Sequence, residues 1–158
     1  MKYLLIAICI GTATMQALCQ EIKIPPAAGN IGINHLALDG YDPVSYFLGK
    51  PVKGNSDYQQ THAGITYWFS TLAARDTFAL HPEKFVPAYG GWCAYAMAVK
   101  GQKVEVDPLT YKIVHGRLLL FYNKRSSNTL DWWNQLPEPE GQLLDKADAN
   151  WQEILERH

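Results

Sequence analysis

Cys93 is the residue whose type and surroundings most directly point to chemistry. It follows two glycines and a tryptophan in the run Gly90-Gly91-Trp92-Cys93-Ala94-Tyr95. Glycines permit close approach of the backbone to a ligand, so a thiol here could act as a nucleophile, a redox group or a metal ligand. The other interpretation is a small buried hydrophobe beside Trp92 and Tyr95, because free cysteine is among the most buried residue types. The residues alone leave both interpretations open.

The histidines are the further candidate metal ligands. No two of them form an H-x-x-x-H pair and the chain has no C-x-x-C motif, so no zinc site of short spacing is encoded. A site assembled from distant segments would combine Cys93 with His62 and His81, or with His115 in place of one of them. Its cofactor would be a transition metal such as copper. Taken alone, each histidine fits a surface or capping role, and His115 lies in an expected hairpin turn.

A pocket lined by aromatic rings is the second kind of site that this sequence could build. Aromatic residues make up 12% of the chain. Tyr46, Trp92 and Tyr95 could line an apolar pocket for a small ligand near Cys93. The same rings could equally fill the core of a small domain.

We expect a binding domain rather than an enzyme, with a metal ion or a small molecule bound near Cys93. The papain-type signature around a catalytic cysteine is absent. Two alternatives stay open. One is a thiol-dependent enzyme, redox or nucleophilic, that uses Cys93. The other is a non-catalytic interaction module with an exposed aromatic patch at Trp132-Trp133.

Residues 1–19 predict a signal peptide. Lys2 precedes the apolar run 3–10, which is much shorter than the roughly 20 residues that span a bilayer. Ala17 and Cys19 fit the small residues before a cut, so we expect cleavage after Cys19 and a secreted or periplasmic product. Lipid anchoring at Cys19 is the alternative, which the preceding Leu18 fits badly. After cleavage Cys93 would be the only cysteine left.

Length and charge narrow the class of protein. With 158 residues, 47% of them hydrophobic, the chain suits one globular domain. A formal net charge of −1 excludes a strongly basic nucleic-acid binder. We expect no transmembrane segment in the mature chain.

The elements that must position these residues indicate an α+β fold. Strands are predicted at 44–47, 64–69, 111–114 and 117–122, joined in one small antiparallel sheet with a hairpin turn at His115-Gly116. Helices packed on it are predicted from Ser70 or Thr71 to about Leu80, near 128–136 and at about 143–156. Residues 49–55 are predicted to be a turn-rich loop, and a polar stretch is expected around Gly101. Residues 20–37 would be an extended lead-in and 38–158 the domain.

Three landmarks resemble the YHS domain family: Asp42-Pro43-Val44, Tyr67-Trp68-Phe69-Ser70 and His81-Pro82-Glu83-Lys84-Phe85. The wider string GYDPVSYF … GITYWFS … HPEKFVPAYGGWCAYA … ADANW is similar to exported, stand-alone YHS-domain proteins. It covers most of the chain between Leu38 and Trp151.

The resemblance implies a YHS-like fold and, for small YHS domains, metal handling through cysteines. The usual cysteine positions fall on Ser45, Ser70 and Ala74. A serine hydroxyl does not replace a thiolate as a ligand for a soft metal. The familiar YHS metal site is therefore not expected in this chain.

Overall fold

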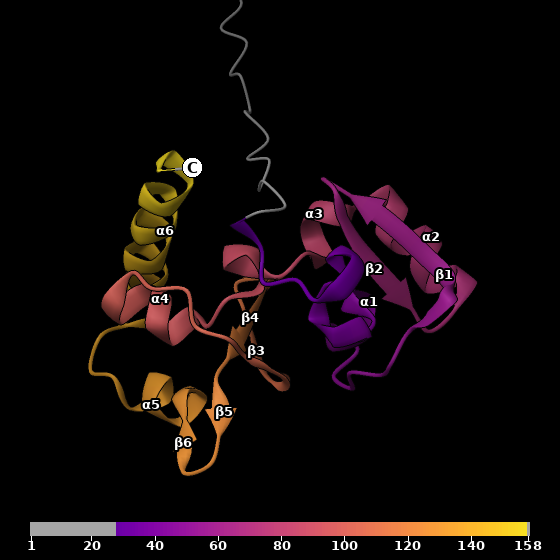
Figure 1. Cartoon of the computed structure of the whole chain (residues 1–158). Helices are drawn as coiled ribbons and strands as arrows, with labels where there is room; N and C mark the ends of the chain where they lie inside the picture. Colours follow the sequence, from indigo (N-terminus) through magenta and orange to yellow (C-terminus); the bar gives the residue numbers. More distant parts are fainter. Residues whose placement is uncertain (1–27, 158) are drawn as a thin grey trace, which may run out of the picture.

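A central hairpin lies between two groups of elements in the computed structural model, which describes residues 28–157 (Figure 1). The hairpin consists of β3 (Asp107–Val114) and β4 (Arg117–Phe121). One group contains α1 (Pro43–Tyr46), β1 (Asn55–His62), β2 (Ile65–Phe69), α2 (Leu72–Leu80) and α3 (Pro82–Phe85). The other contains α4 (Ala94–Lys100), β5 (Asn123–Lys124), β6 (Ser127–Asn128), α5 (Thr129–Gln135) and α6 (Glu140–Glu156). Short 3₁₀ turns are η2 (Ile33–His35), η3 (Leu38–Gly40) and η4 (Ala88–Gly91).

β4 is buried along almost its whole length and contributes to two hydrophobic cores. Leu119 and Phe121 belong to a C-terminal core that also contains Met97, Trp133 and Trp151. Leu118 and Leu120 belong to an N-terminal core that also contains Tyr46, Phe69, Phe78 and Phe85. Because successive side chains of a strand point to opposite faces, an unbroken apolar run is what a strand between two cores requires.

The α+β class is confirmed, but the expectation of one small sheet is wrong. Within residues 28–157 the strands form three separate antiparallel pairs, β1–β2, β3–β4 and β5–β6. The side of β4 away from β3 is met instead by the segment before α4, through parallel bridges that join Pro87 to Leu118 and Cys93 to Leu120.

The strand predicted at 44–47 is wrong, because these residues form the helix α1 and its C-cap. Asp42 caps the helix by accepting a 2.9 Å hydrogen bond from the backbone N–H of Val44, and Pro43 occupies the first turn, where a missing N–H costs nothing. A short apolar run does not distinguish a buried strand from a buried helix. At residues 43–46 the N-cap formed by Asp42 favours the helix.

Among the elements that the sequence did not predict are β1 and α4. β1 carries the polar sequence NSDYQQTH, and its side chains are mostly exposed, so it lacks the alternation by which half-buried strands are recognised. α4 occupies the residues directly before Gly101, where the sequence predicts a polar stretch without regular structure. Its run AYAMAVK ends at Gly101, which has φ 59° and forms the left-handed C-cap typical of helix ends.

Other expectations are confirmed. Thr71 caps α2, Asn128 caps α5, and β3 and β4 meet at the His115-Gly116 turn. His115 is exposed there. α6 starts at Glu140, somewhat before the expected position.

The described part of the lead-in, residues 28–37, packs on the domain. Ala28 and Ala37 are buried, and the indole of Trp92 donates a 2.6 Å hydrogen bond to the carbonyl of Ala28. The predicted signal peptide lies outside the described residues. Between residues 28 and 157, no helix combines the length and apolar character needed to cross a membrane.

Candidate functional site

The Cys93 thiol is buried, with 0% of the residue exposed. Its sulfur lies 3.3 Å from the hydroxyl of Thr129 and accepts a 3.5 Å contact from the backbone N–H of Tyr122. Thr129 donates its own hydroxyl to the carbonyl of Tyr122 at 3.0 Å, which leaves the thiol as the donor to Thr129. Cys93 thus ties the start of α4 to the start of α5, and its burial agrees with the packing interpretation.

Of the ligand-binding candidates, Cys93 and Tyr95 are brought together. Both line a cavity of about 170 Å³, together with Trp132, whose ring packs edge-on against Tyr95 at 5.6 Å between centroids. Trp92 does not line this cavity. Its indole N–H donates instead to the backbone carbonyl of Ala28. Tyr46 lies in the N-terminal core, with its ring 5.0 Å from that of Tyr111.

The metal candidates Cys93, His62 and His81 are not brought together. His62, at the end of β1, packs edge-on against Phe78 at 6.1 Å between ring centroids. His81 follows α2 and lies exposed, 3.9 Å from the carboxylate of Glu83. The part of the chain that the structure describes has no group of three or more His, Cys, Asp or Glu side chains arranged to hold a metal ion. These residues do not fit a copper centre.

Two of the three positions at which the YHS resemblance places cysteines, Ser45 and Ser70, hydrogen-bond to Asp42. The hydroxyl of Ser45 donates to the backbone carbonyl of Asp42 at 2.6 Å. Ser70 donates to the carboxylate of the same residue, and Ala74 lies in the first turn of α2, where its N–H donates to Thr71. The two hydroxyls therefore serve as hydrogen-bonding groups of the fold.

Of the two tryptophans proposed as an interaction patch, only one is on the surface. Trp132 is 43% exposed, whereas Trp133 is 1% exposed and packs in the C-terminal core. The indole N–H of Trp133 donates to Glu140 at 2.9 Å. The aromatic surface patch expected at Trp132 and Trp133 is therefore wrong for Trp133 and contains only the ring of Trp132.

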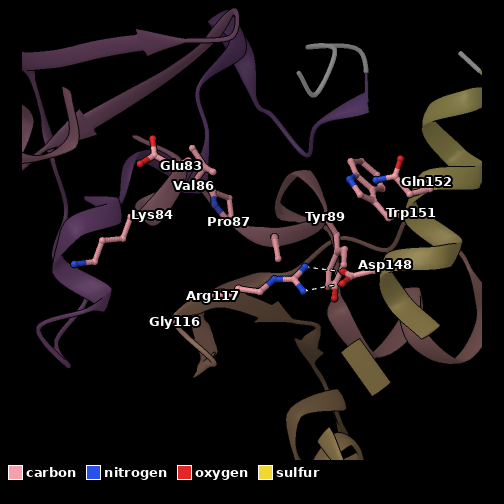
Figure 2. Close-up of a pocket in the computed structure, with 11 residues that line it drawn as sticks. Glu83, Lys84, Val86, Pro87, Tyr89, Gly116, Arg117, Asp148, Trp151 and Gln152 are labelled. Carbon is pink, nitrogen blue, oxygen red and sulfur yellow. Dashed lines mark hydrogen bonds and ion pairs between the residues drawn. The ribbon is translucent and has the colours of Figure 1, made fainter. Parts of the chain in front are cut away.

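A larger pocket, of about 390 Å³, opens between η4, the start of β4 and α6 (Figure 2). Tyr89 comes from η4, Arg117 is the first residue of β4, and Asp148 and Trp151 lie one turn apart on α6. Volumes of roughly 300–1,000 Å³ are typical of small-molecule sites. We call it the Tyr89 pocket. Its other lining residues are Glu83, Lys84, Val86, Pro87, Ala88, Gly116 and Gln152.

A two-pronged ion pair crosses the Tyr89 pocket. Arg117 donates from its two terminal nitrogens to the two oxygens of Asp148, at 2.9 and 2.7 Å. This hydrogen bonding raises the pKa of Arg117 further above its ordinary value, so the guanidinium is charged at any working pH. Its central carbon lies 5.3 Å from the ring centroid of Tyr89, within cation–π range.

The hydroxyl of Tyr89 is the one polar group of this arrangement that lacks a partner. Tyr89 is 2% exposed, and its buried oxygen makes no hydrogen bond of standard geometry within residues 28–157, although it lies near enough to Asp148 and Arg117 for both groups to act on it. Burial raises the pKa of the phenol well above its usual range; the charge of Arg117 lowers it and that of Asp148 raises it, both by less. Tyr89 is therefore a neutral phenol with a proton to donate.

The backbone at this pocket is strained. Tyr89 has φ 55° and Gly90 has φ 61°, the left-handed region that is costly for a residue with a side chain. A Cβ on Gly90 would lie 3.2 Å from the indole of Trp151 and 3.2 Å from the Cα of Gly29. Tyr89 is one of eight non-glycine residues with positive φ in the described range, and its ring lies beside the guanidinium of Arg117.

Tyr89, Arg117 and Asp148 are not among the residues predicted from the sequence to form a site. Two of them lie inside strings that carry the family resemblance, PAYGG and ADANW. That resemblance is the one sequence signal that points to them, because the approach of Trp151 to Gly90 exists only in the folded structure. Nothing in the sequence indicated that Arg117 joins them.

The comparisons with known proteins gave no relative. No protein-family model, no curated protein and no solved structure matches this chain.

Proposed function

We propose that this protein is an exported, YHS-like domain that binds a small organic molecule in the Tyr89 pocket. The observation that carries the proposal is the buried hydroxyl of Tyr89, which has no hydrogen-bond partner beside the Arg117–Asp148 pair. A buried polar group without a partner costs about 1–3 kcal/mol of stability. A ligand that supplies the missing acceptor would recover that free energy on binding.

A second feature supports the same site. The strained turn at Tyr89 and Gly90 also costs free energy that the fold must offset elsewhere. Its effect is to hold the Tyr89 ring in the wall of a pocket of about 390 Å³.

The pocket favours a small ligand over the alternatives based on Cys93. A metal centre or a reactive thiol would need Cys93 free to bond, whereas its sulfur is engaged with Thr129 and Tyr122. The Tyr89 pocket instead offers a volume of about 390 Å³ beside the Arg117–Asp148 pair. Binding without catalysis is the function that these groups support best.

The YHS-like fold is part of the proposal, and contacts between the landmarks support it. Ser70, from the second landmark, donates to Asp42 of the first. The ring of Phe85, from the third landmark, lies 6.5 Å from that of Phe78 in α2. Export rests on the leader-like residues 1–19.

The proposal is tested by mapping where small molecules bind. A fragment library is screened against the ¹⁵N-labelled protein by NMR, and fragments that shift the amide signals of Tyr89, Gly90 and Arg117 are titrated. Tyr89→Phe should weaken their binding about five- to tenfold, which corresponds to one hydrogen bond of about 1 kcal/mol. The variant itself should be more stable than the parent, by up to about 1–3 kcal/mol, because it no longer buries a hydroxyl without a partner.

Tyr46→Phe is the matched control. Tyr46 also carries a buried hydroxyl without a partner, but it lies in the N-terminal core, so its loss should leave fragment binding unchanged. Fragments that gather only beside Trp132, or no binding in the Tyr89 pocket, would refute the proposal.

A further inference from the structure

We infer that the cavity beside Trp132 is a second binding site, for a small molecule that has one flat ring and a negative charge. The cavity lies between α4, α5 and the β5–β6 hairpin, and we call it the Trp132 pocket. It shares no lining residue with the Tyr89 pocket, so the site is independent of the proposed function. Three properties point to its ligand: the volume, the aromatic walls and one lysine.

The volume of the Trp132 pocket suits a single ring. The pocket measures about 170 Å³. Sites for drug-sized molecules measure roughly 300–1,000 Å³, whereas an apolar cavity of about 150 Å³ binds benzene. Tyr95, Ala96, Val104 and Trp132 give much of the wall an apolar surface. A ligand of one ring with a short polar substituent therefore fits this pocket better than a larger molecule.

Two aromatic rings form a corner in the wall. The ring centroids of Tyr95 and Trp132 lie 5.6 Å apart, with their planes at 67°, and Tyr122 also lines the pocket. Aromatic rings favour offset-stacked or edge-to-face contacts with a second ring, so a flat ligand ring can stack on one wall and meet the other with its edge. Trp132 is 43% exposed, so a ligand reaches its ring directly from solvent.

Lys100 determines which charge the ligand carries. Groups of aromatic rings also bind cations, but the one Lys, Arg, Asp or Glu among the lining residues is Lys100, the last residue of α4. Its ammonium has no hydrogen-bond or ion-pair partner among residues 28–157. Asp131, next to Trp132 in the chain, does not line the pocket. The pocket therefore disfavours a cation and offers an unpaired positive charge to an anion. Because Lys100 is exposed, the preference should be only a few-fold.

Three probes of nearly equal size test the inference: phenylacetate, phenylacetamide and phenethylamine. They share one ring and differ in charge, and their dissociation constants are measured by NMR titration at the Tyr95 and Thr129 amides and at the indole N–H of Trp132. Phenylacetate should bind about threefold tighter than phenylacetamide, and phenethylamine should bind most weakly. Lys100→Gln should remove the advantage of phenylacetate over phenylacetamide. Lys50→Gln, which changes an exposed lysine just after α1, is the matched control and should not. Trp132→Ala should weaken the binding of all three probes by at least about fivefold.

Other outcomes overturn the inference. Tightest binding of phenethylamine would make the Trp132 pocket a cation site, and equal binding of all three probes would remove the role of Lys100, so either result refutes the ligand class. If no probe shifts these signals, or if Trp132→Ala leaves binding unchanged, the pocket is not a binding site. The amides of Tyr89 and Arg117 report on the other pocket in the same spectra, so the proposed function is tested separately by its own signals.

Discussion

Ser70 donates two hydrogen bonds to a single carboxylate oxygen of Asp42, from its hydroxyl at 2.6 Å and from its backbone N–H at 2.9 Å. The other carboxylate oxygen accepts the N–H of Val44, so one buried side chain caps α1 and fixes the loop before α2. A carboxylate is the acceptor suited to three donors, because charge-assisted hydrogen bonds are roughly twice as strong as neutral ones. The landmark Asp42-Pro43-Val44 thus acts structurally at its first residue.

Asp42→Asn should destabilise the protein by about 2–3 kcal/mol, because the amide turns an acceptor into a donor facing other donors. The free energy of unfolding is measured in urea. Asp57→Asn, on the exposed strand β1, is the control and should change it by less than about 0.5 kcal/mol. Equal effects of the two substitutions would show that the buried network contributes little.

Gly90→Ala should be more destabilising than Gly116→Ala. Both glycines have positive φ, 61° and 75°, so both substitutions incur a left-handed backbone cost of about 1 kcal/mol. Only Gly90 faces crowding, by Trp151 and Gly29, whereas Gly116 has open space. The difference in unfolding free energy, expected to be at least about 1 kcal/mol, measures the contact between η4 and α6. If the two variants are equally stable, that contact is loose.

Cys93 should resist alkylation in the folded protein. Its sulfur is fully buried and hydrogen-bonded, and thiol reactivity requires an accessible thiolate. Mass spectrometry after treatment with iodoacetamide near neutral pH should find almost no adduct without denaturant and complete labelling in urea. Fast labelling of the native protein would restore the thiol-dependent enzyme as a candidate.

The stability that Glu140 contributes should depend on pH. Its carboxylate accepts from Lys112 and from Trp133, and the hydrogen bond from Lys112 lowers its pKa below the ordinary 4.5, against a smaller opposing effect of burial. A lowered folded-state pKa stabilises the fold above the unfolded pKa, and this contribution is lost as the pH falls through the folded value.

Urea midpoints of the parent and Glu140→Gln, compared between about pH 3 and pH 7, should therefore differ at neutral pH and converge in acid. Glu156→Gln, at the exposed end of α6, serves as the control with no such trend. A difference that stays constant across this range would contradict the assigned role of Lys112.

Helices and strands whose own residues include a cap or a turn signal could be predicted from the sequence. Thr71 and Asn128 are side-chain caps, and His115-Gly116 separates two apolar runs, so α2, α5 and the β3–β4 hairpin could be predicted from their own residues. β1 could not be predicted because its polar side chains face outward; its strand character comes from pairing with β2. The single sheet was wrong for two reasons: residues 44–47 form the helix α1, and β2 pairs with β1 while the segment before α4 meets the free side of β4.

The candidate site was less predictable than the fold. Tyr89, Arg117 and Asp148 are far apart in the chain, and no known catalytic or binding motif surrounds any of them. Nothing in the sequence distinguishes these three residues from other tyrosines, arginines and aspartates. They form a site only because α6 packs on η4 and brings them together. Cys93 is a candidate because its thiol can react or bind a metal, but the same residue type is often buried, and the sequence alone does not decide between the two.

Because β4 contributes side chains to both hydrophobic cores, it affects how the protein unfolds. Leu118 and Leu120 are held by one core, and Leu119 and Phe121 by the other, so the strand cannot leave either core without withdrawing side chains from both. The two groups of elements are thereby coupled into a single cooperative unit, although no sheet joins them. Arg117 is the first residue of this strand. A ligand that binds at its guanidinium would therefore stabilise the whole domain against unfolding.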